Sequence, residues 1–104
     1  METIIGLGKA GCRIADRFAQ YPQYDVYKMD VGLKRTPKTY GFKAATSPEE
    51  YEDSVGSLKR FVKDVKGDVL FVVSGCGEIS GASLRILEQI KKCNIHILYI
   101  FSDP

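Results

Sequence analysis

The fold of the N-terminal part is decided by the stretch Thr3-Ile4-Ile5-Gly6-Leu7-Gly8-Lys9-Ala10-Gly11. Thr3–Leu7 is a short apolar run that stops at a glycine, which is typical of a buried strand. In the following segment, Gly11–Gln20, apolar residues recur on one helical face: Ile14, Ala15, Phe18 and Ala19. A glycine turn between a strand and a helix lets the backbone approach a phosphate, to which the helix N-terminus offers free N–H groups. The stretch therefore predicts a strand–turn–helix unit with a phosphate site.

A second glycine turn lies near the middle of the chain, in Ser74-Gly75-Cys76-Gly77-Glu78-Ile79-Ser80-Gly81. It follows Asp68–Ser74, an unbroken apolar segment suited to burial on both faces of a parallel sheet. It precedes Ser80–Lys92, a predicted helix whose inward residues would be Leu84, Leu87 and Ile90. Two such turns in one sheet make a stronger case for a phosphate ligand than either turn makes alone.

The segment between the two glycine turns supplies a second strand and a loop. Tyr24–Asp30 alternates apolar and polar residues and predicts a strand. Val31–Thr46 is polar and basic, and we expect a solvated loop that includes a short edge strand at Thr39–Lys43. The basic residues of this loop include Lys34, Arg35 and Lys38.

The next helix has the clearest pattern. Ser47 is placed to cap it, and Glu50 completes a capping box with Pro48 in the first turn. Apolar residues then recur at intervals of four, three, four and three, which predicts one helix that runs to Gly67. Those residues are Tyr51, Val55, Leu58, Val62 and Val65.

A last buried strand is predicted over Asn94–Ser102. Strands and helices therefore alternate, which predicts a mostly parallel sheet with helices on both faces, a three-layer Rossmann-like α/β fold. The expected strand order is 3-2-1-4-5, or its core 2-1-4-5. We expect residues 1–104 to form one nucleotide-binding domain, the front part of a longer protein, because no helix follows the last strand.

Composition narrows the classes of protein that fit. The net charge of +2 is too near neutral to indicate a nucleic-acid partner. The longest apolar runs, Val69–Val73 and Ile97–Phe101, are far shorter than the roughly 20 residues that span a bilayer. The odd number of cysteines, 3, argues against a disulfide framework. We therefore expect a cytoplasmic protein with reduced cysteines.

At the two glycine turns the chain resembles the tubulin and FtsZ GTPases. The family's opening loop, of the form GxxGN, is matched by Gly8-Lys9-Ala10-Gly11-Cys12, followed by Arg13 and Ile14. Its glycine signature is matched by Gly77-Glu78-Ile79-Ser80-Gly81-Ala82-Ser83. Ala44-Ala45-Thr46-Ser47-Pro48 is similar to the loop that faces the γ-phosphate in FtsZ, and Asp30 stands where FtsZ has an acidic residue ending its second strand.

The resemblance implies a tubulin/FtsZ-like topology, a guanine nucleotide (GTP or GDP with Mg²⁺) and self-association into filaments or oligomers. The nucleotide-binding residues that it implies, together with those of the glycine turns, are Gly6, Gly8, Lys9, Ala10, Gly11, Cys12, Arg13, Asp30, Ala44, Ala45, Thr46, Gly75, Cys76, Gly77, Glu78, Ser80 and Gly81. The family's base-binding segment and catalytic loop have no counterpart in this sequence. GTP hydrolysis would therefore need residues that this sequence does not contain, and no catalytic residue is assigned.

Two other functions fit the same residues. The first is an NAD-type dinucleotide domain of an oxidoreductase, because Gly6, Gly8 and Gly11 fit its GxGxxG fingerprint and Asp30 follows at the distance of a ribose-binding acid. The second is a tubulin-like assembly protein that has lost its nucleotide. Glu78 favours this reading, because a carboxylate beside a triphosphate is repulsive unless a cation intervenes.

Overall fold

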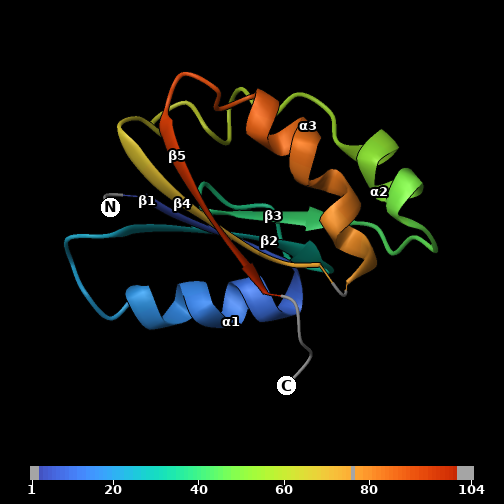
Figure 1. Cartoon of the computed structure of the whole chain (residues 1–104), viewed down its shortest axis with the longest axis horizontal. Helices are drawn as coiled ribbons and strands as arrows, with labels where there is room; N and C mark the ends of the chain where they lie inside the picture. Colours follow the sequence, from blue (N-terminus) through green and yellow to red (C-terminus); the bar gives the residue numbers. More distant parts are fainter. Residues whose placement is uncertain (1–2, 76, 101–104) are drawn as a thin grey trace.

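A five-stranded parallel sheet forms the centre of the computed structural model, which describes residues 3–75 and 77–100 (Figure 1). Its order is β3-β2-β1-β4-β5, so the predicted α/β fold and strand order are confirmed. One helix covers one face of the sheet, and the other helical segments cover the opposite face. In chain order the elements are β1 (Thr3–Leu7), α1 (Gly8–Phe18), β2 (Asp25–Val31), β3 (Thr39–Phe42), α2 (Pro48–Ser54), β4 (Asp68–Ser74), the 3₁₀ helix η1 (Glu78–Ala82), α3 (Ser83–Glu88) and β5 (Asn94–Ile100).

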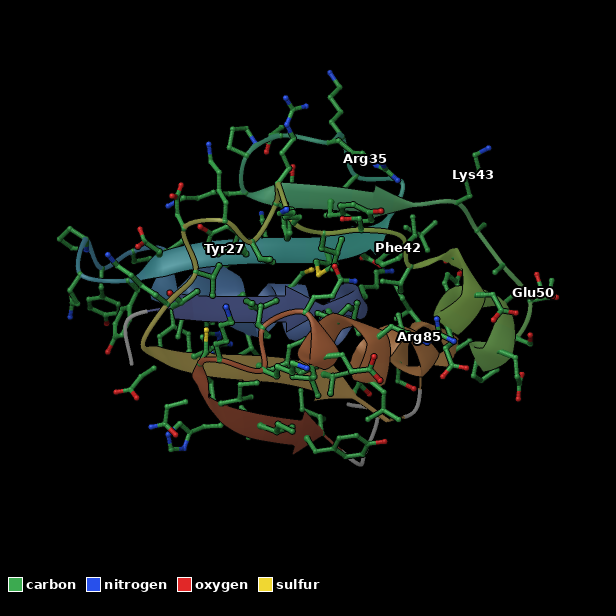
Figure 2. All side chains as sticks on the ribbon, turned by 90° about the horizontal axis from the view of Figure 1, so that it is seen from above. Tyr27, Arg35, Phe42, Lys43, Glu50 and Arg85 are labelled. Atoms are coloured by element: carbon green, nitrogen blue, oxygen red, sulfur yellow. The ribbon has the colours of Figure 1, made fainter. Side chains whose placement is uncertain are left out.

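The two central strands, β1 and β4, are buried by layers on both sides. Ile5 faces the α2 and α3 side, where it joins Phe71 in the larger core cluster. Ile4 faces the α1 side, where it packs with Val72 and Ala15. This burial on both faces explains why the central strands are continuously apolar. β3, predicted as a short edge strand, does lie at one edge of the sheet (Figure 2).

Two glycines allow helix α1 to contact the backbone of the sheet directly. A Cβ on Gly6 would lie 2.5 Å from the Gly11 carbonyl oxygen and 2.9 Å from the Ala15 Cβ. A Cβ on Gly11 would overlap the Val72 carbonyl oxygen of β4. α1 begins at Gly8, three residues before the predicted start, and the helix backbone rests directly on the strands.

The helix predicted from Ser47 to Gly67 is much shorter than its apolar stripe indicates. Its start is confirmed, because the Ser47 Oγ accepts a hydrogen bond of 3.2 Å from the Glu50 backbone N–H. The helix ends at Ser54, since Val55 is extended with φ −72° and ψ 110°. Gly56 follows directly, and glycine is about 1 kcal/mol less favourable than alanine inside a helix. Residues 55–58 are irregular and residues 59–64 form turns, so the prediction of a continuous helix is wrong.

The apolar stripe is nevertheless buried, because another side chain holds the irregular segment in place. Gln89 accepts a hydrogen bond of 2.6 Å from the Leu58 backbone N–H. The same amide group donates to the Gly56 carbonyl oxygen at 2.9 Å. Val55 and Leu58 lie in the core, and Val62 packs against it. The stripe therefore marks which residues face inward, but it does not fix the backbone conformation.

The helix predicted over Ser80–Lys92 is divided. It begins as the 3₁₀ turn η1 and continues as the short helix α3, which ends at Glu88. Of the predicted inward residues, Ile90 is buried and Leu87 packs against the core, as expected, but Leu84 is 66% exposed and Ile86 is fully buried in its place. Within η1, Gly81 contacts the Pro48 carbonyl so closely that a Cβ would overlap it. The 3₁₀ turn η1 therefore packs directly on the start of α2.

Strand β5 was predicted to be buried, but it forms an exposed edge of the sheet. Ile97, Leu98 and Tyr99 are 54%, 42% and 45% exposed, respectively. Helix α1 packs on β1, β2 and β4, so the layer on that side is centred away from β5. An apolar run alone does not distinguish a central strand from an edge strand. The last two residues of the predicted strand lie outside the described residues.

Candidate functional site

The first glycine turn and the second lie next to each other at the carboxyl edge of the sheet. β1 and β4 are parallel neighbours, with Leu7 paired to Val73, so the chain leaves both strands at the same edge. From β1 the chain crosses to β2 on one side, whereas β4 lies on the other side. Ligands of open α/β sheets bind at such a change of direction, outside the carboxyl ends of the strands. The residues predicted from the two turns are therefore brought together, except Cys76, which lies outside the described residues.

Gly8 is the residue at which the first turn requires glycine. Its φ of +79° lies in the left-handed region of backbone conformation, which residues other than glycine adopt only at a cost in free energy. Ile79 from the second turn packs directly above it, 2.8 Å from where a Gly8 Cβ would be. The two turns are thus in contact through a buried apolar side chain that the sequence reasoning did not assign to the site.

The N-terminus of α1 has the polarity that an anion needs. Leu7, which precedes the helix, makes no side-chain cap, and the first turn contains no acidic residue. The first N–H groups of a helix have no partner within the helix and carry part of its positive dipole. Lys9 is exposed in this first turn and Ala10 is partly buried, while Arg13 is exposed one turn later. Backbone donors and cations therefore gather where β1 ends.

The second turn uses several of its backbone donors internally. The N–H of Gly75 donates to the Ile100 carbonyl at 2.9 Å, and that of Ser80 donates to the Gly77 carbonyl at 3.1 Å. The N–H of Gly77 makes a longer bond of 3.4 Å to the Ser74 carbonyl. Glu78 is exposed at the start of η1. This turn consequently offers a phosphate fewer donors than α1 does.

The loop before α2 is adjacent to the second turn but is also internally bonded. Gly81 packs on Pro48, which brings η1 against this loop. The Ala45 N–H donates to the Tyr51 hydroxyl at 3.0 Å, and the Thr46 hydroxyl donates to the Glu50 carboxylate at 2.7 Å. Ala44 is exposed. The three predicted segments therefore meet at one edge of the sheet. Of the three, the N-terminus of α1 offers an anion the most backbone N–H donors.

Asp30 lies at the end of β2, and its carboxylate is close enough to Cys12 to affect its pKa. Its Oδ1 accepts a hydrogen bond of 2.7 Å from the Val31 backbone N–H. A carboxylate at the end of the second strand, near the first helix, is where a dinucleotide domain binds a ribose. The position of Asp30 therefore suits the dinucleotide reading as well as the GTPase reading.

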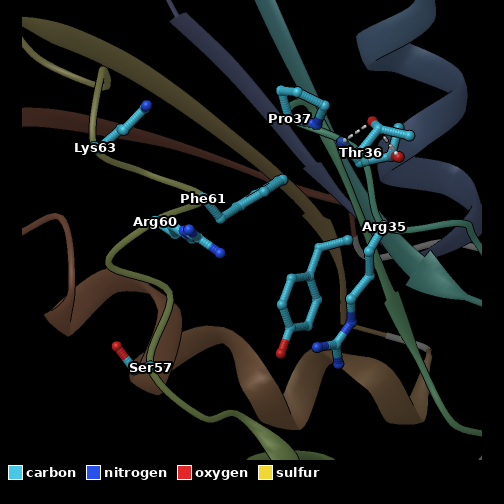
Figure 3. Close-up of a pocket in the computed structure, with 9 residues that line it drawn as sticks. Arg35, Thr36, Pro37, Ser57, Arg60, Phe61 and Lys63 are labelled. Carbon is cyan, nitrogen blue, oxygen red and sulfur yellow. Dashed lines mark hydrogen bonds between the residues drawn. The ribbon is translucent and has the colours of Figure 1, made fainter.

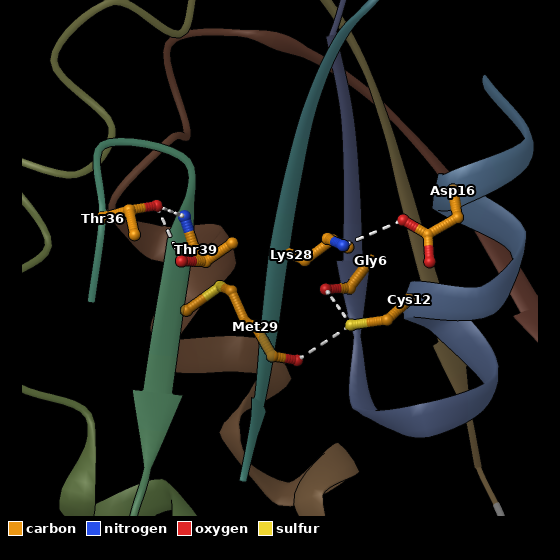
Figure 4. A network of polar contacts seen from close by, with 7 residues as sticks. All are labelled: Gly6, Cys12, Asp16, Lys28, Met29, Thr36 and Thr39. Carbon is orange, nitrogen blue, oxygen red and sulfur yellow. Dashed lines mark hydrogen bonds and ion pairs between the residues drawn. The ribbon is translucent and has the colours of Figure 1, made fainter. Parts of the chain in front are cut away.

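Cys12 is a structural residue of α1 that joins three elements (Figure 4). Its thiol donates to the carbonyl oxygens of Gly6 and Met29, both at 3.5 Å. Burial, and next the negative charge of Asp30, raise the pKa of this thiol from 9.0 to about 11. The nearby ion pair between Lys28 and Asp16, 2.9 Å long, ties the same helix to β2.

We expect the raised pKa to make Cys12 slow to alkylate. At pH 8 about one in a thousand Cys12 thiols is ionised, compared with about one in ten for an ordinary thiol, and only the thiolate reacts. Iodoacetamide labelling followed by peptide mass spectrometry should therefore modify Cys12 about 100-fold more slowly in the folded chain than in urea. The folded rate should keep rising tenfold per pH unit up to pH 10. Equal rates in both states would contradict this prediction.

Within residues 3–75 and 77–100, no three Asp, Glu, His or Cys side chains are grouped as metal ligands would be. Nor is any helix in the described part of the chain long and apolar enough to span a membrane.

No known protein family, curated protein or solved structure matches this chain.

Proposed function

We propose that this chain is a nucleotide-binding module that holds the phosphates of a guanine nucleotide at the N-terminus of α1. One observation carries the proposal: a left-handed Gly8 and a helix N-terminus without a side-chain cap stand at the strand-order reversal, beside the exposed Lys9. Such a turn binds phosphate through backbone N–H groups and the helix dipole. The resemblance to the tubulin and FtsZ GTPases selects guanine as the base.

The proposed nucleotide brings Mg²⁺ with it, since magnesium is commonly held by substrate phosphates together with one or two carboxylates. Self-association into filaments or oligomers forms the second part of the proposal, and it rests on the resemblance alone. Analytical ultracentrifugation of the chain, with and without GTP and Mg²⁺, tests that part separately from binding.

NAD is the second candidate ligand, because Asp30 lies where a dinucleotide domain has its ribose-binding acid, although this position is equally compatible with a guanine nucleotide. Both nucleotides would use the N-terminus of α1, so binding alone does not separate them. Calorimetric titrations with GTP–Mg²⁺ and with NAD are therefore compared. Thermal unfolding gives an independent measure, because a ligand at 100-fold excess over its Kd stabilises the folded chain by about 2.7 kcal/mol. Stabilisation by NAD and none by GTP would replace the first proposal with the second.

We expect Lys9→Gln to weaken binding of the preferred nucleotide about fivefold. An exposed charge pair contributes up to about 1 kcal/mol, which corresponds to that change in Kd. Lys91→Gln is the matched control, because Lys91 is also exposed but lies in the connection before β5, away from the turn. Equal effects of the two substitutions would indicate non-specific attraction and would contradict a phosphate site at α1.

Glu78→Gln separates the guanine proposal from the dinucleotide one. A GTPase-like site brings the phosphates to the second turn, where removal of this exposed carboxylate should tighten GTP binding severalfold, or weaken it if the carboxylate holds Mg²⁺. A dinucleotide site does not require that turn. An unchanged affinity for GTP, alongside an effect of Lys9→Gln, would therefore count against the guanine proposal.

A further inference from the structure

A cavity of about 520 Å³ lies beside β3, between the segment that enters this strand and the turn that follows Leu58 (Figure 3). Its size is within the range of small-molecule sites, about 300–1,000 Å³. It is lined by Arg35, Thr36, Pro37, Thr39, Tyr40, Ser57, Arg60, Phe61 and Lys63. None of these residues belongs to the candidate nucleotide site.

The lining of the cavity contains basic side chains and no acidic side chain that would neutralise them. Arg35, Arg60 and Lys63 contribute three cations, and no lining residue is a carboxylate. The ion pairs among the described residues join Lys28 to Asp16 and Lys38 to Asp25, so they use none of these cations. The nearby Asp64 follows Lys63 in the chain but is not part of the lining. A dense group of like charges around a hollow favours an anionic occupant.

Arg35 is held in place by an aromatic neighbour. Its guanidinium carbon lies 4.2 Å from the centre of the Tyr40 ring, and its Nη2 donates to the Gly41 carbonyl oxygen at 3.4 Å. Tyr40 is buried and makes an edge-to-face contact with Phe61, with ring centres 5.6 Å apart. A stacked guanidinium keeps free N–H groups for a second partner.

The opposite wall is also anchored. Arg60 and Lys63 lie on the turn that begins after Leu58, and Gln89 fixes that point by its bond to the Leu58 N–H. Phe61, between the two cations in sequence, packs edge-to-face on Tyr27 at 5.4 Å. The cations of this wall therefore project from a segment that the core holds in position.

We propose that this cavity binds a small phosphorylated molecule, with its phosphates against Arg35, Arg60 and Lys63 and its apolar part against Phe61 and Pro37. Two guanidinium groups suit phosphate because their N–H groups pair with its oxygens two at a time. The exposed Ser57 hydroxyl adds a neutral donor, whereas the Thr36 hydroxyl is already bonded to Thr39. A concave site of this volume accommodates one small ligand, whereas a polymeric anion would need a longer track.

The test is a titration of the ¹⁵N-labelled chain with inorganic pyrophosphate, followed by amide chemical shifts. We expect shifts grouped in residues 35–40 and 57–63, and at least tenfold weaker binding in the double variant Arg60→Gln/Lys63→Gln. The control, Lys34→Gln/Lys43→Gln, removes two exposed charges outside the lining and should change Kd less than twofold. Both variants change exposed side chains, so preserved shift dispersion shows that each is folded.

Three results of this titration would overturn the proposal: no saturable shifts, equal weakening in both variants, or shifts confined to residues 8–10 and 77–81. The last result would assign pyrophosphate to the proposed nucleotide site. A longer anion, such as a single-stranded oligonucleotide, that binds much more tightly than pyrophosphate through the same cations would also overturn it. Failure of GTP and NAD binding would leave this site untouched, since the two share no residue.

Discussion

Gly11→Ala is expected to lower the free energy of unfolding by about 3 kcal/mol or more. The added methyl group would overlap the Val72 carbonyl oxygen, a backbone atom of the central strand β4 that has no freedom to rotate away. Overpacking of a core typically costs about 1–3 kcal/mol, and a clash between two backbones belongs at or above the upper end. Urea unfolding followed by circular dichroism measures the loss, and thermal unfolding should show a decrease of at least about 12 °C.

The matched control is Gly56→Ala, since nothing lies within 4 Å of a Cβ at that position and its backbone is not left-handed. It should change the free energy of unfolding by less than about 0.5 kcal/mol, as surface substitutions usually do. Gly6→Ala should resemble Gly11→Ala, because its Cβ meets the Gly11 carbonyl oxygen. A Gly11→Ala chain as stable as the control would mean that α1 does not rest on the sheet as described.

Leu58→Ala is expected to cost about 2–5 kcal/mol, the range for removing a fully buried leucine side chain. Leu58 is 1% exposed although it lies in an irregular segment. Lys59→Ala changes the exposed neighbour and should be close to neutral. Urea unfolding of both variants measures the difference. A small loss for Leu58→Ala would indicate that residues 55–67 are not anchored to the core.

Whether residues 55–67 are helical can be tested separately from whether they are buried. If residues 47–67 formed one helix, Gly56→Ala would stabilise the chain by up to about 1 kcal/mol and would raise the helical signal in circular dichroism. The structure predicts no rise in the helical signal, because Val55 is already extended before Gly56, and this signal is the deciding measurement. Gly56→Ala thus serves both experiments.

The strands and their order could be predicted because apolar runs and alternation report directly on burial in a sheet. The wrong predictions concern segments in which the pattern of apolar residues does not determine both the burial of the side chains and the conformation of the backbone. Spacings of three and four mark inward residues in a helix, but the irregular segment after Ser54 places Leu58 and Val62 inward too. In β5, the apolar residues predicted a buried strand, although Ile97 and Tyr99 are exposed at an edge.

In the candidate site, too, some features could be predicted from the sequence and others could not. The glycine at position 8 was predictable, because a tight turn between a strand and a helix requires positive φ. That Gly6 and Gly11 serve close packing depends on Val72, a residue of a distant strand. The basic cavity was out of reach of sequence reasoning: Arg35 belongs to a loop expected to be solvated, and Arg60 belongs to the charged face of a helix that the structure does not form.

The parallel order of the sheet has a consequence for how the chain reaches this structure. Among the described strands every pairing is parallel, so no hairpin can start the sheet, and each pairing must close a loop first. Thr3 pairs with both Asp25 and Val69, and the entropic cost of closure rises with the length of the loop. Contacts between distant residues also slow folding. During synthesis from the N-terminus, β1, α1 and β2 can associate early, but the second edge of β1 stays unpaired until Asp68–Ser74 has left the ribosome.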